Sequence, residues 1–241
     1  MVISNFDELG NADFSGGVTM LVDKPENWTS FDVVNKIRFS LKKLTGIKKI
    51  KVGHAGTLDP LATGLLIVAA GKDTKQIDNF QELNKVYSGT IYLGATTPSF
   101  DREFEPDQTY PVSHIDIRSI REACKKLTGE IIQIPPAYSA VSINGERAYK
   151  KARKGEEFTL RERKVNIYQF TVDDFKLPLL KFRVECQKGT YIRSLASDLG
   201  KELGSGAYLF DLRREKIGNH NVDNAFQLEE LIFFLENIQK N

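Results

Sequence analysis

The chain has 241 residues, 41% hydrophobic and 27% charged, which allows one ample core or one domain with a small appendage. A net charge of +2 is too small to identify a nucleic-acid binder by itself. Two distant cysteines, three histidines without ligand spacing and the lack of a long apolar run predict a soluble cytoplasmic protein with no disulfide framework, no metal site and no membrane span.

The first predicted elements are an arm, a strand and a helix. Residues 1–17 are polar and contain glycines, which predicts a loose N-terminal arm. Residues 18–22 have the composition of a strand. Thr29, with Asp32 three residues later, fits the start of a helix whose apolar stripe ends at Gly46.

Basic residues are concentrated on this helix and just after it. From Lys36 to Lys51 there are seven basic residues and no acidic ones. The seven are Lys36, Arg38, Lys42, Lys43, Lys48, Lys49 and Lys51. Such a run is usually a solvated face, and it is also what a surface that binds backbone phosphates requires.

The next stretch, Gly53 to Gly64, reads Gly-His-Ala-Gly-Thr-Leu-Asp-Pro-Leu-Ala-Thr-Gly. Its glycines allow positive φ and close approach of a ligand, and Pro60 stiffens the turn after Asp59. Residues 65–70 are uncharged and predict a buried strand. An isolated Asp-Pro pair is usually a simple turn, but a carboxylate on a rigid loop beside a buried strand is also a suitable platform for chemistry.

This run resembles the active-site signature of the TruB family, the bacterial pseudouridine synthases that modify the T loop of tRNA. The signature is long and has little freedom, so chance agreement is improbable. The resemblance implies that Asp59 is the catalytic residue and that His54 fills the place that the target base leaves in the RNA. It covers nearly all of residues 18–220, including the strand, the turn at Lys24 and the helix near the N-terminus.

Two further positions follow from the resemblance. A short helix over residues 73–83 precedes an alternating strand over 86–94, in which Tyr87 matches the family tyrosine that packs on the target base. Asp101 aligns with the family aspartate that pairs with the active-site arginine. Pro98 and Phe100 depart from the family pattern and leave the path of this loop open.

A basic insertion follows a predicted helix over residues 117–127. The pair Asn144-Gly145 is a strong hairpin signal. The segment after it contains Tyr149 among five basic residues: Arg147, Lys150, Lys151, Arg153 and Lys154. An exposed amphipathic helix would give the same pattern, whereas the resemblance implies a thumb-like insertion, about residues 135–157, that grips RNA.

The last motifs lie after two strands predicted over residues 165–170 and 180–186. The run Gly-Thr-Tyr-Ile-Arg, which opens a predicted helix, matches the family motif whose arginine orients the catalytic aspartate, here Arg193. By the same resemblance Tyr191 lines the pocket and Leu212 forms its wall.

The fold class expected from the resemblance is α+β, with a mixed, mostly antiparallel central sheet flanked by helices, the pseudouridine synthase fold. Residues 18–241 would form a single catalytic domain. Residues 221–241 hold one predicted helix, over 228–238, and are too short for the PUA domain that many family members carry, so none is expected.

The expected function is isomerisation of the uridine at position 55 of tRNA to pseudouridine, by a monomer that recognises the T-arm stem-loop without cofactor or metal. Asp59 acts either as a nucleophile at C1′ or as a base at the ribose. The expected RNA contacts are His54, Lys24, Lys42, Lys43, Lys48, Lys49, Arg147, Lys150 and Lys151.

Two alternatives remain. The first is a non-catalytic tRNA-binding or tRNA-folding module on the same fold. The presence of all three matched residues argues against it: Asp59, Tyr87 and Arg193. The second is a carboxylate-dependent hydrolase, which requires a second acid that the sequence does not identify.

Overall fold

The structure, a computed structural model, describes residues 2–143 and 145–238, which fold into two compact units. Unit 1 combines the chain up to Val86 with the chain from Arg213 onward, and unit 2 is Tyr87–Leu212. The boundaries fall inside strands β5 (Lys85–Leu93) and β13 (Ala207–Ile217), so the chain passes between the units twice. The single catalytic domain expected for residues 18–241 stays a prediction.

Unit 1 contains a mixed sheet. Its strands, apart from the end of β13, are β1 (Val2–Ile3), β2 (Val18–Lys24), β3 (Val52–His54), β4 (Thr63–Ala70), β14 (His220–Asn221) and β15 (Phe226–Gln227). Strand β4 runs antiparallel to β2 and β3, whereas β13 runs parallel to β4 and pairs Arg214 with Gly64. This parallel pairing brings the middle of β13 to the start of β4.

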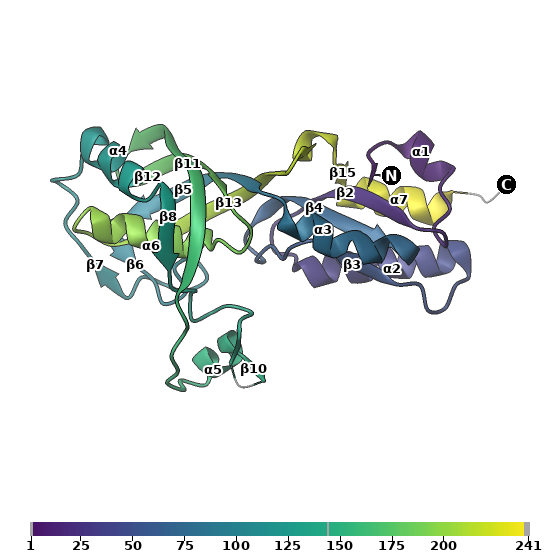
Figure 1. Cartoon of the computed structure of the whole chain (residues 1–241), viewed down its shortest axis with the longest axis horizontal. Helices are drawn as coiled ribbons and strands as arrows, with labels where there is room; N and C mark the ends of the chain where they lie inside the picture. The colour runs from purple at the N-terminus through teal and green to yellow at the C-terminus, as the bar shows by residue number, and fades with distance from the viewer. Residues whose placement is uncertain (1, 144, 239–241) are drawn as a thin grey trace. The chain divides into compact units, whose positions relative to one another are not determined.

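Helices cover both faces of this sheet (Figure 1). They are α1 (Phe6–Gly10), α2 (Ser30–Thr45), η1 (Gly71–Gln76), α3 (Ile77–Glu82), η2 (Val222–Asn224) and α7 (Leu228–Asn237). In β4, Leu66 and Val68 join the apolar core of α2 and α7, whereas Leu65 and Ile67 join a second cluster that includes residues of α3. Side chains alternate between the faces of a strand, so the uncharged run is buried on both sides, as predicted.

Helix α2 begins and ends where the sequence predicts. The Thr29 side chain accepts a hydrogen bond from the Asp32 N–H, and the Asp32 carboxylate accepts one from the Thr29 N–H. These contacts satisfy backbone donors that a helix start leaves unpaired. Gly46 ends the helix in the left-handed conformation, with φ of 71°.

The prediction of a loose N-terminal arm is wrong. Strand β1 pairs with β2 in parallel, and α1 places Leu9, which has no exposed surface, in the core. The Phe6 ring lies 4.8 Å from the rings of both Phe226 and Phe234. These apolar contacts with distant residues hold the segment, and its polar composition alone does not reveal them.

In unit 2, strands β8 (Gly129–Gln133), β11 (Arg163–Lys176) and β12 (Leu179–Cys186) join β5 and β13 in a sheet of the order β13, β5, β12, β11, β8. Outside this sheet lie β6 (Ala95–Thr96), β7 (Gln108–Thr109), α4 (Ile117–Lys126) and α6 (Ile192–Glu202). Strand β11 is antiparallel to both β8 and β12. The mixed, mostly antiparallel sheet with flanking helices is therefore confirmed.

An insertion, residues 134–162, separates β8 from β11 and contains β9 (Ser142–Ile143), β10 (Glu146–Arg147) and α5 (Ala148–Arg153). Strands β9 and β10 form an antiparallel hairpin, and Gly145 has a φ of 87°, as its predicted turn requires. Asn144, the other predicted turn residue, lies outside the described residues.

Candidate active site

Asp59 lies in the loop between β3 and β4, and the Arg214 side chain joins the two ends of this loop. The Arg214 side chain is 1% exposed; its Nε donates to the Leu65 carbonyl at 2.7 Å and its Nη2 to the Gly56 carbonyl at 3.0 Å. Gly64 has a φ of 101°, and a Cβ there would overlap the Arg214 backbone. One guanidinium therefore binds both ends of the loop that carries Asp59.

Lys24 is fully buried at the end of β2. Its Nζ donates to the carbonyls of Trp28, Pro25 and Pro60, at 2.6, 2.9 and 3.2 Å. These carbonyls match the three donors of an ammonium group. The predicted contact of Lys24 with RNA does not fit this position, because the side chain has no exposed surface and its donors are directed at the backbone.

Burial lowers the pKa of Lys24 to about 8, although the negative charge of Asp59 opposes this shift. The positive charge of Arg214 adds to the lowering. The protonated form of Lys24 is therefore less favourable in the folded protein than in the unfolded chain.

The low pKa of Lys24 predicts a pH-dependent stability. Between pH 8 and the usual lysine value of 10.5, the unfolded chain binds a proton at Lys24 that the folded protein has lost. The free energy of unfolding should therefore rise with pH in this window, by up to about 1 kcal/mol per unit relative to Lys24→Met. Urea denaturation of both proteins at pH 8 and pH 10 tests this. An equal change in the free energy of unfolding between the two pH values in both proteins would contradict the prediction.

His54 is half-buried at the end of β3. Burial lowers its pKa, and the charge of Arg214 lowers it further, whereas a hydrogen bond with the Gly56 backbone opposes them. The imidazole is therefore neutral at pH 7.

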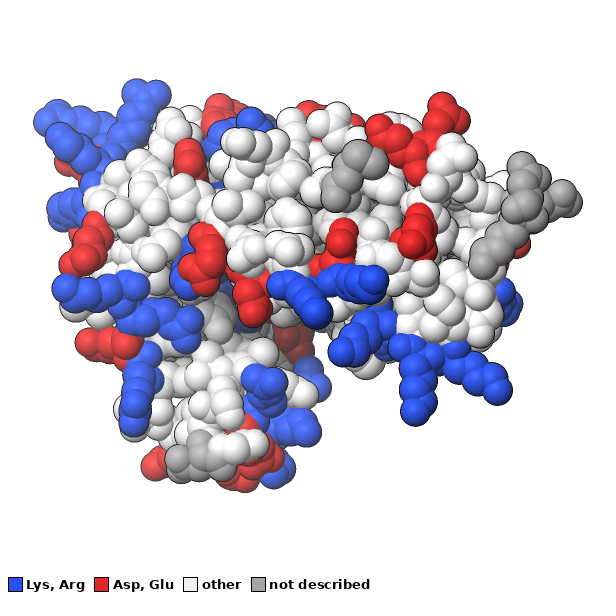
Figure 2. Space-filling model, turned by 45° about the vertical axis from the view of Figure 1, so that its right-hand side comes forward, with Lys and Arg blue, Asp and Glu red and all other residues white. Residues whose placement is uncertain are grey.

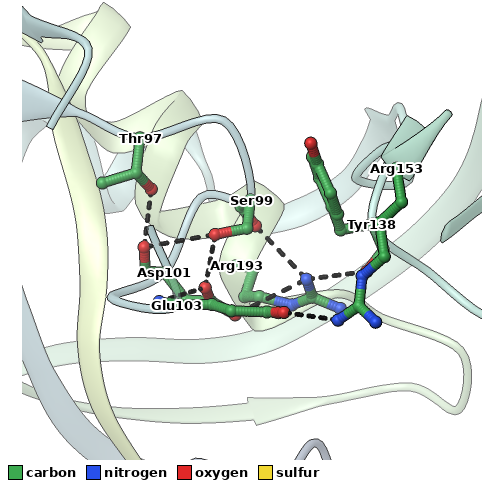
Figure 3. Close-up of polar contacts among 7 residues, drawn as sticks. All are labelled: Thr97, Ser99, Asp101, Glu103, Tyr138, Arg153 and Arg193. Atoms are coloured by element: carbon green, nitrogen blue, oxygen red, sulfur yellow. Dashed lines mark hydrogen bonds and ion pairs between the residues drawn. The ribbon is translucent and has the colours of Figure 1, made fainter. Parts of the chain in front are cut away.

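Arg193 lies in the first turn of α6 in unit 2 and is 5% exposed. Its Nη1 donates to the carbonyls of Tyr138, at 2.9 Å, and Ser99, at 3.2 Å, and lies 3.5 Å from Asp101 Oδ2 (Figure 3). The structure thus places Asp101 beside Arg193, as the resemblance implied.

The loop around Pro98 and Phe100 fixes Asp101. The Ser99 hydroxyl donates to Asp101 Oδ1 at 2.5 Å, and the Thr97 hydroxyl donates to the Asp101 carbonyl at 2.6 Å (Figure 3). Phe100 turns the chain with a positive φ of 61°, which is uncommon outside glycine. The loop departs from the family pattern in sequence, but its path is defined and places Asp101 beside Arg193.

The insertion is bound to the same cluster. Arg153 of α5 donates to Glu103 Oε1 at 2.8 Å, and the Glu103 N–H donates to Asp101 Oδ1 at 3.0 Å (Figure 3). The Tyr138 ring packs on Phe104 with centroids 4.7 Å apart. The insertion thus contacts the buried ion pair directly, through the Tyr138 carbonyl on Arg193, and also indirectly, through Glu103.

The remaining predicted pocket residues of unit 2 lie on two strands and just before a helix. Tyr87 is buried in β5, and Leu212 is half-buried in β13. Tyr191 precedes α6; its N–H donates to Gln133 Oε1 at 3.0 Å, and its carbonyl accepts from Gln133 Nε2 at 3.1 Å. Asp59 and His54 belong to unit 1, so the expected pairing of Arg193 with Asp59 stays a prediction.

The predicted phosphate contacts differ in exposure. Lys42, Lys43, Lys48 and Lys49 are exposed on α2 and on the segment after it. In the insertion Arg147 and Lys150 are exposed, whereas Lys151 forms ion pairs with Glu156 at 2.7 Å and Glu146 at 3.6 Å. Figure 2 shows Lys and Arg gathered without acidic neighbours at the lower right, and mixed with acidic residues at the bottom.

Neither a metal-binding cluster nor a membrane-spanning helix is present in the described part of the chain. Residues 2–143 and 145–238 contain no group of three or more His, Cys, Asp or Glu side chains that could hold a metal ion. In the same residues no helix is long and apolar enough to cross a membrane.

Similar solved structures identify the class of protein. The chain aligns with a TM-score of 0.66 and 29% identity to a chain of a Cbf5–Nop10–Gar1 complex, covering 91% of this chain and 54% of that one. A chain of an H/ACA RNP bound to a substrate RNA containing 2′-deoxyuridine gives the same TM-score at 27% identity, covering 94% and 55%. The fold is that of the pseudouridine synthases.

Sequence comparisons then identify the family. The N-terminal domain of TruB family pseudouridylate synthases matches residues 42–192. A protein of Parabacteroides distasonis named tRNA pseudouridine synthase B is 51% identical over 93% of this chain and 95% of its own length. A Flavobacterium johnsoniae protein of the same name is 49% identical over 94% and 98%. The chain therefore belongs to the TruB family.

Proposed function

We propose that this chain converts the uridine at position 55 in the T loop of tRNA to pseudouridine, with Asp59 as the catalytic carboxylate. The observation that carries the proposal is the position of Asp59 on a loop closed by the buried Arg214, in a chain about half identical to relatives named tRNA pseudouridine synthase B over nearly its full length. The substrate and the reaction follow from those relatives.

The reaction breaks the bond between N1 of uracil and C1′ of ribose, turns the base, and forms a bond from C5 to C1′. The hydrogen on C5 is released as a proton, and N1 gains a proton, so atoms and electrons balance without oxidation or reduction. Asp59 acts at the ribose, either by attacking C1′ or by removing a ribose proton. Both roles require a carboxylate that is ionised and fixed.

The supporting roles belong to unit 2. Arg193 favours the ionised form of Asp59, and Asp101 balances the charge of Arg193. Tyr87 stacks on the uracil and assists removal of the C5 proton, while Tyr191 and Leu212 line the pocket. In unit 1, the neutral ring of His54 occupies the space that the flipped base leaves in the RNA.

The protein acts as a monomer in the cytoplasm and recognises the T-arm stem-loop. Exposed lysines of α2 and its following segment contact backbone phosphates, joined by Arg147 and Lys150 of the insertion. Lys151 joins them only if RNA phosphate replaces Glu146 and Glu156.

The phosphate contacts predict a specific salt dependence. Changing Lys48 and Lys49 together to Gln should flatten the plot of log binding constant against log salt by about one to two units of slope. Chemistry at saturating RNA should stay unchanged, because phosphate contacts position the RNA. The matched control changes Lys125 and Lys126, on α4, to Gln and should keep the wild-type slope. An unchanged slope in the Lys48 and Lys49 variant would indicate a merely solvated face.

The proposal is tested by mapping pseudouridine at nucleotide resolution in an unmodified tRNA transcript after incubation with purified protein. We expect modification at position 55 alone, and none in a transcript with cytidine there. Modification at another uridine, or at none, would contradict the proposal.

A further inference from the structure

Ser30, the first residue of α2, contacts both backbone polar groups of Leu58, the residue before Asp59. The Leu58 N–H donates to Ser30 Oγ at 2.8 Å, and the Ser30 hydroxyl donates to the Leu58 carbonyl at 3.1 Å. Ser30 is 1% exposed and Leu58 is 3% exposed. One hydroxyl thus satisfies two buried backbone groups that lie 28 positions away in the sequence.

The residue after Asp59 is fixed by the same part of the chain. The Pro60 carbonyl accepts hydrogen bonds from the Asn27 N–H at 2.8 Å and from Lys24 Nζ at 3.2 Å. Asp59 therefore lies between two anchored residues, and their partners all lie between Lys24, at the end of β2, and Ser30, at the start of α2.

We infer that Ser30 is a positioning residue that holds Asp59 in its reactive geometry through Leu58; this inference rests on the proposed catalytic role of Asp59. The capped start of α2 fixes Ser30 itself, because Thr29 and Asp32 determine where the helix begins. A carboxylate must be placed within a fraction of an ångström of its reacting atom, and a displacement of about 1 Å can cost about 100-fold in rate.

Removal of the hydroxyl should slow the chemistry rather than weaken RNA binding. In Ser30→Ala both polar groups of Leu58 lose this partner, while the apolar Leu58 side chain keeps its buried place. We expect the single-turnover rate at saturating tRNA to fall about 10- to 100-fold. The Kd for tRNA should stay within about twofold, because it depends on contacts with phosphates and bases.

Ser40 provides a matched control in the same helix. It has no exposed surface, and its hydroxyl also forms two hydrogen bonds, to the Lys36 carbonyl at 3.3 Å and to Glu236 Oε1 at 3.1 Å. Ser40→Ala should lower the melting temperature but keep the wild-type rate, since its partners lie away from the Asp59 loop. If Ser40→Ala loses as much rate as Ser30→Ala, general destabilisation explains both losses, and the inference is overturned.

Ser30→Cys keeps the shape of the side chain and replaces the hydroxyl with a weak donor. If Ser30→Ala does not fold, the Cys variant serves in its place: a slowed rate with unchanged Kd supports the inference, and a wild-type rate overturns it. Asp59→Asn separates the two hypotheses. A wild-type rate in Ser30→Ala beside an inactive Asp59→Asn overturns only the positioning role, whereas an active Asp59→Asn overturns the proposed catalytic role on which it rests.

Discussion

Asp59→Asn is expected to abolish isomerisation and leave tRNA binding within about twofold of wild type, because binding rests on phosphate contacts and stacking. The amide keeps the size of the side chain but removes its charge, so it can neither attack C1′ nor accept a proton. Loss of a general base alone costs about 10²- to 10⁴-fold in rate.

Single-turnover conversion and filter binding on the same preparation measure the two quantities. Asp78→Asn is the matched control, since Asp78 is an exposed carboxylate of unit 1 on α3 and should keep full activity. Conversion by Asp59→Asn near the wild-type rate would remove Asp59 from the mechanism.

Arg193→Met should destabilise the protein by about 3 to 5 kcal/mol, the usual cost when one partner of a buried ion pair is removed. Asp101 then stays 7% exposed without its cation, and the carbonyls of Ser99 and Tyr138 lose a donor. The double variant with Asp101→Asn should recover part of this loss, because no uncompensated charge remains buried.

Urea denaturation of the wild type, both single variants and the double variant gives the coupling energy directly. The Arg193→Met variants should also lose activity, since Arg193 is proposed to keep Asp59 ionised. If the double variant is no more stable than Arg193→Met, the ion pair is not the source of the destabilisation.

Local signals were sufficient where structure depends on neighbours in sequence. The cap at Thr29 and the glycine at position 46 define α2, and the uncharged run at 65–70 defines most of β4. These features depend on a few neighbouring residues, so their sequence pattern is the same in any fold.

Contacts between distant segments produced the errors. Strand β13 was not predicted, because its C-terminal half is charged and the burial of Arg214 depends on two carbonyls about 150 positions away. Lys24 was expected to contact RNA, but three backbone carbonyls accept its hydrogen bonds in the interior, where lysines are rarely found.

The candidate site shows the same division. Resemblance to the family supplied Asp59, Asp101 and Arg193, and the structure adds the contacts that hold Asp101, Arg193 and the loop that carries Asp59. No pattern in the sequence links Ser30 to Leu58, because the two meet only when α2 packs beside the loop. Residues that position a catalytic group through its backbone are therefore the part of a site that sequence reasoning misses.

The most direct test of the central claim follows the hydrogen on C5 of the target uridine. A T-arm stem-loop carrying tritium at C5 of that uridine is incubated with the protein, and released tritium, free uracil and the mass of the RNA are measured together. Isomerisation predicts that tritium passes to water, that no uracil is released and that the RNA keeps its mass apart from the label. Retained tritium would indicate binding without catalysis, and free uracil would indicate hydrolysis; either result would contradict the account.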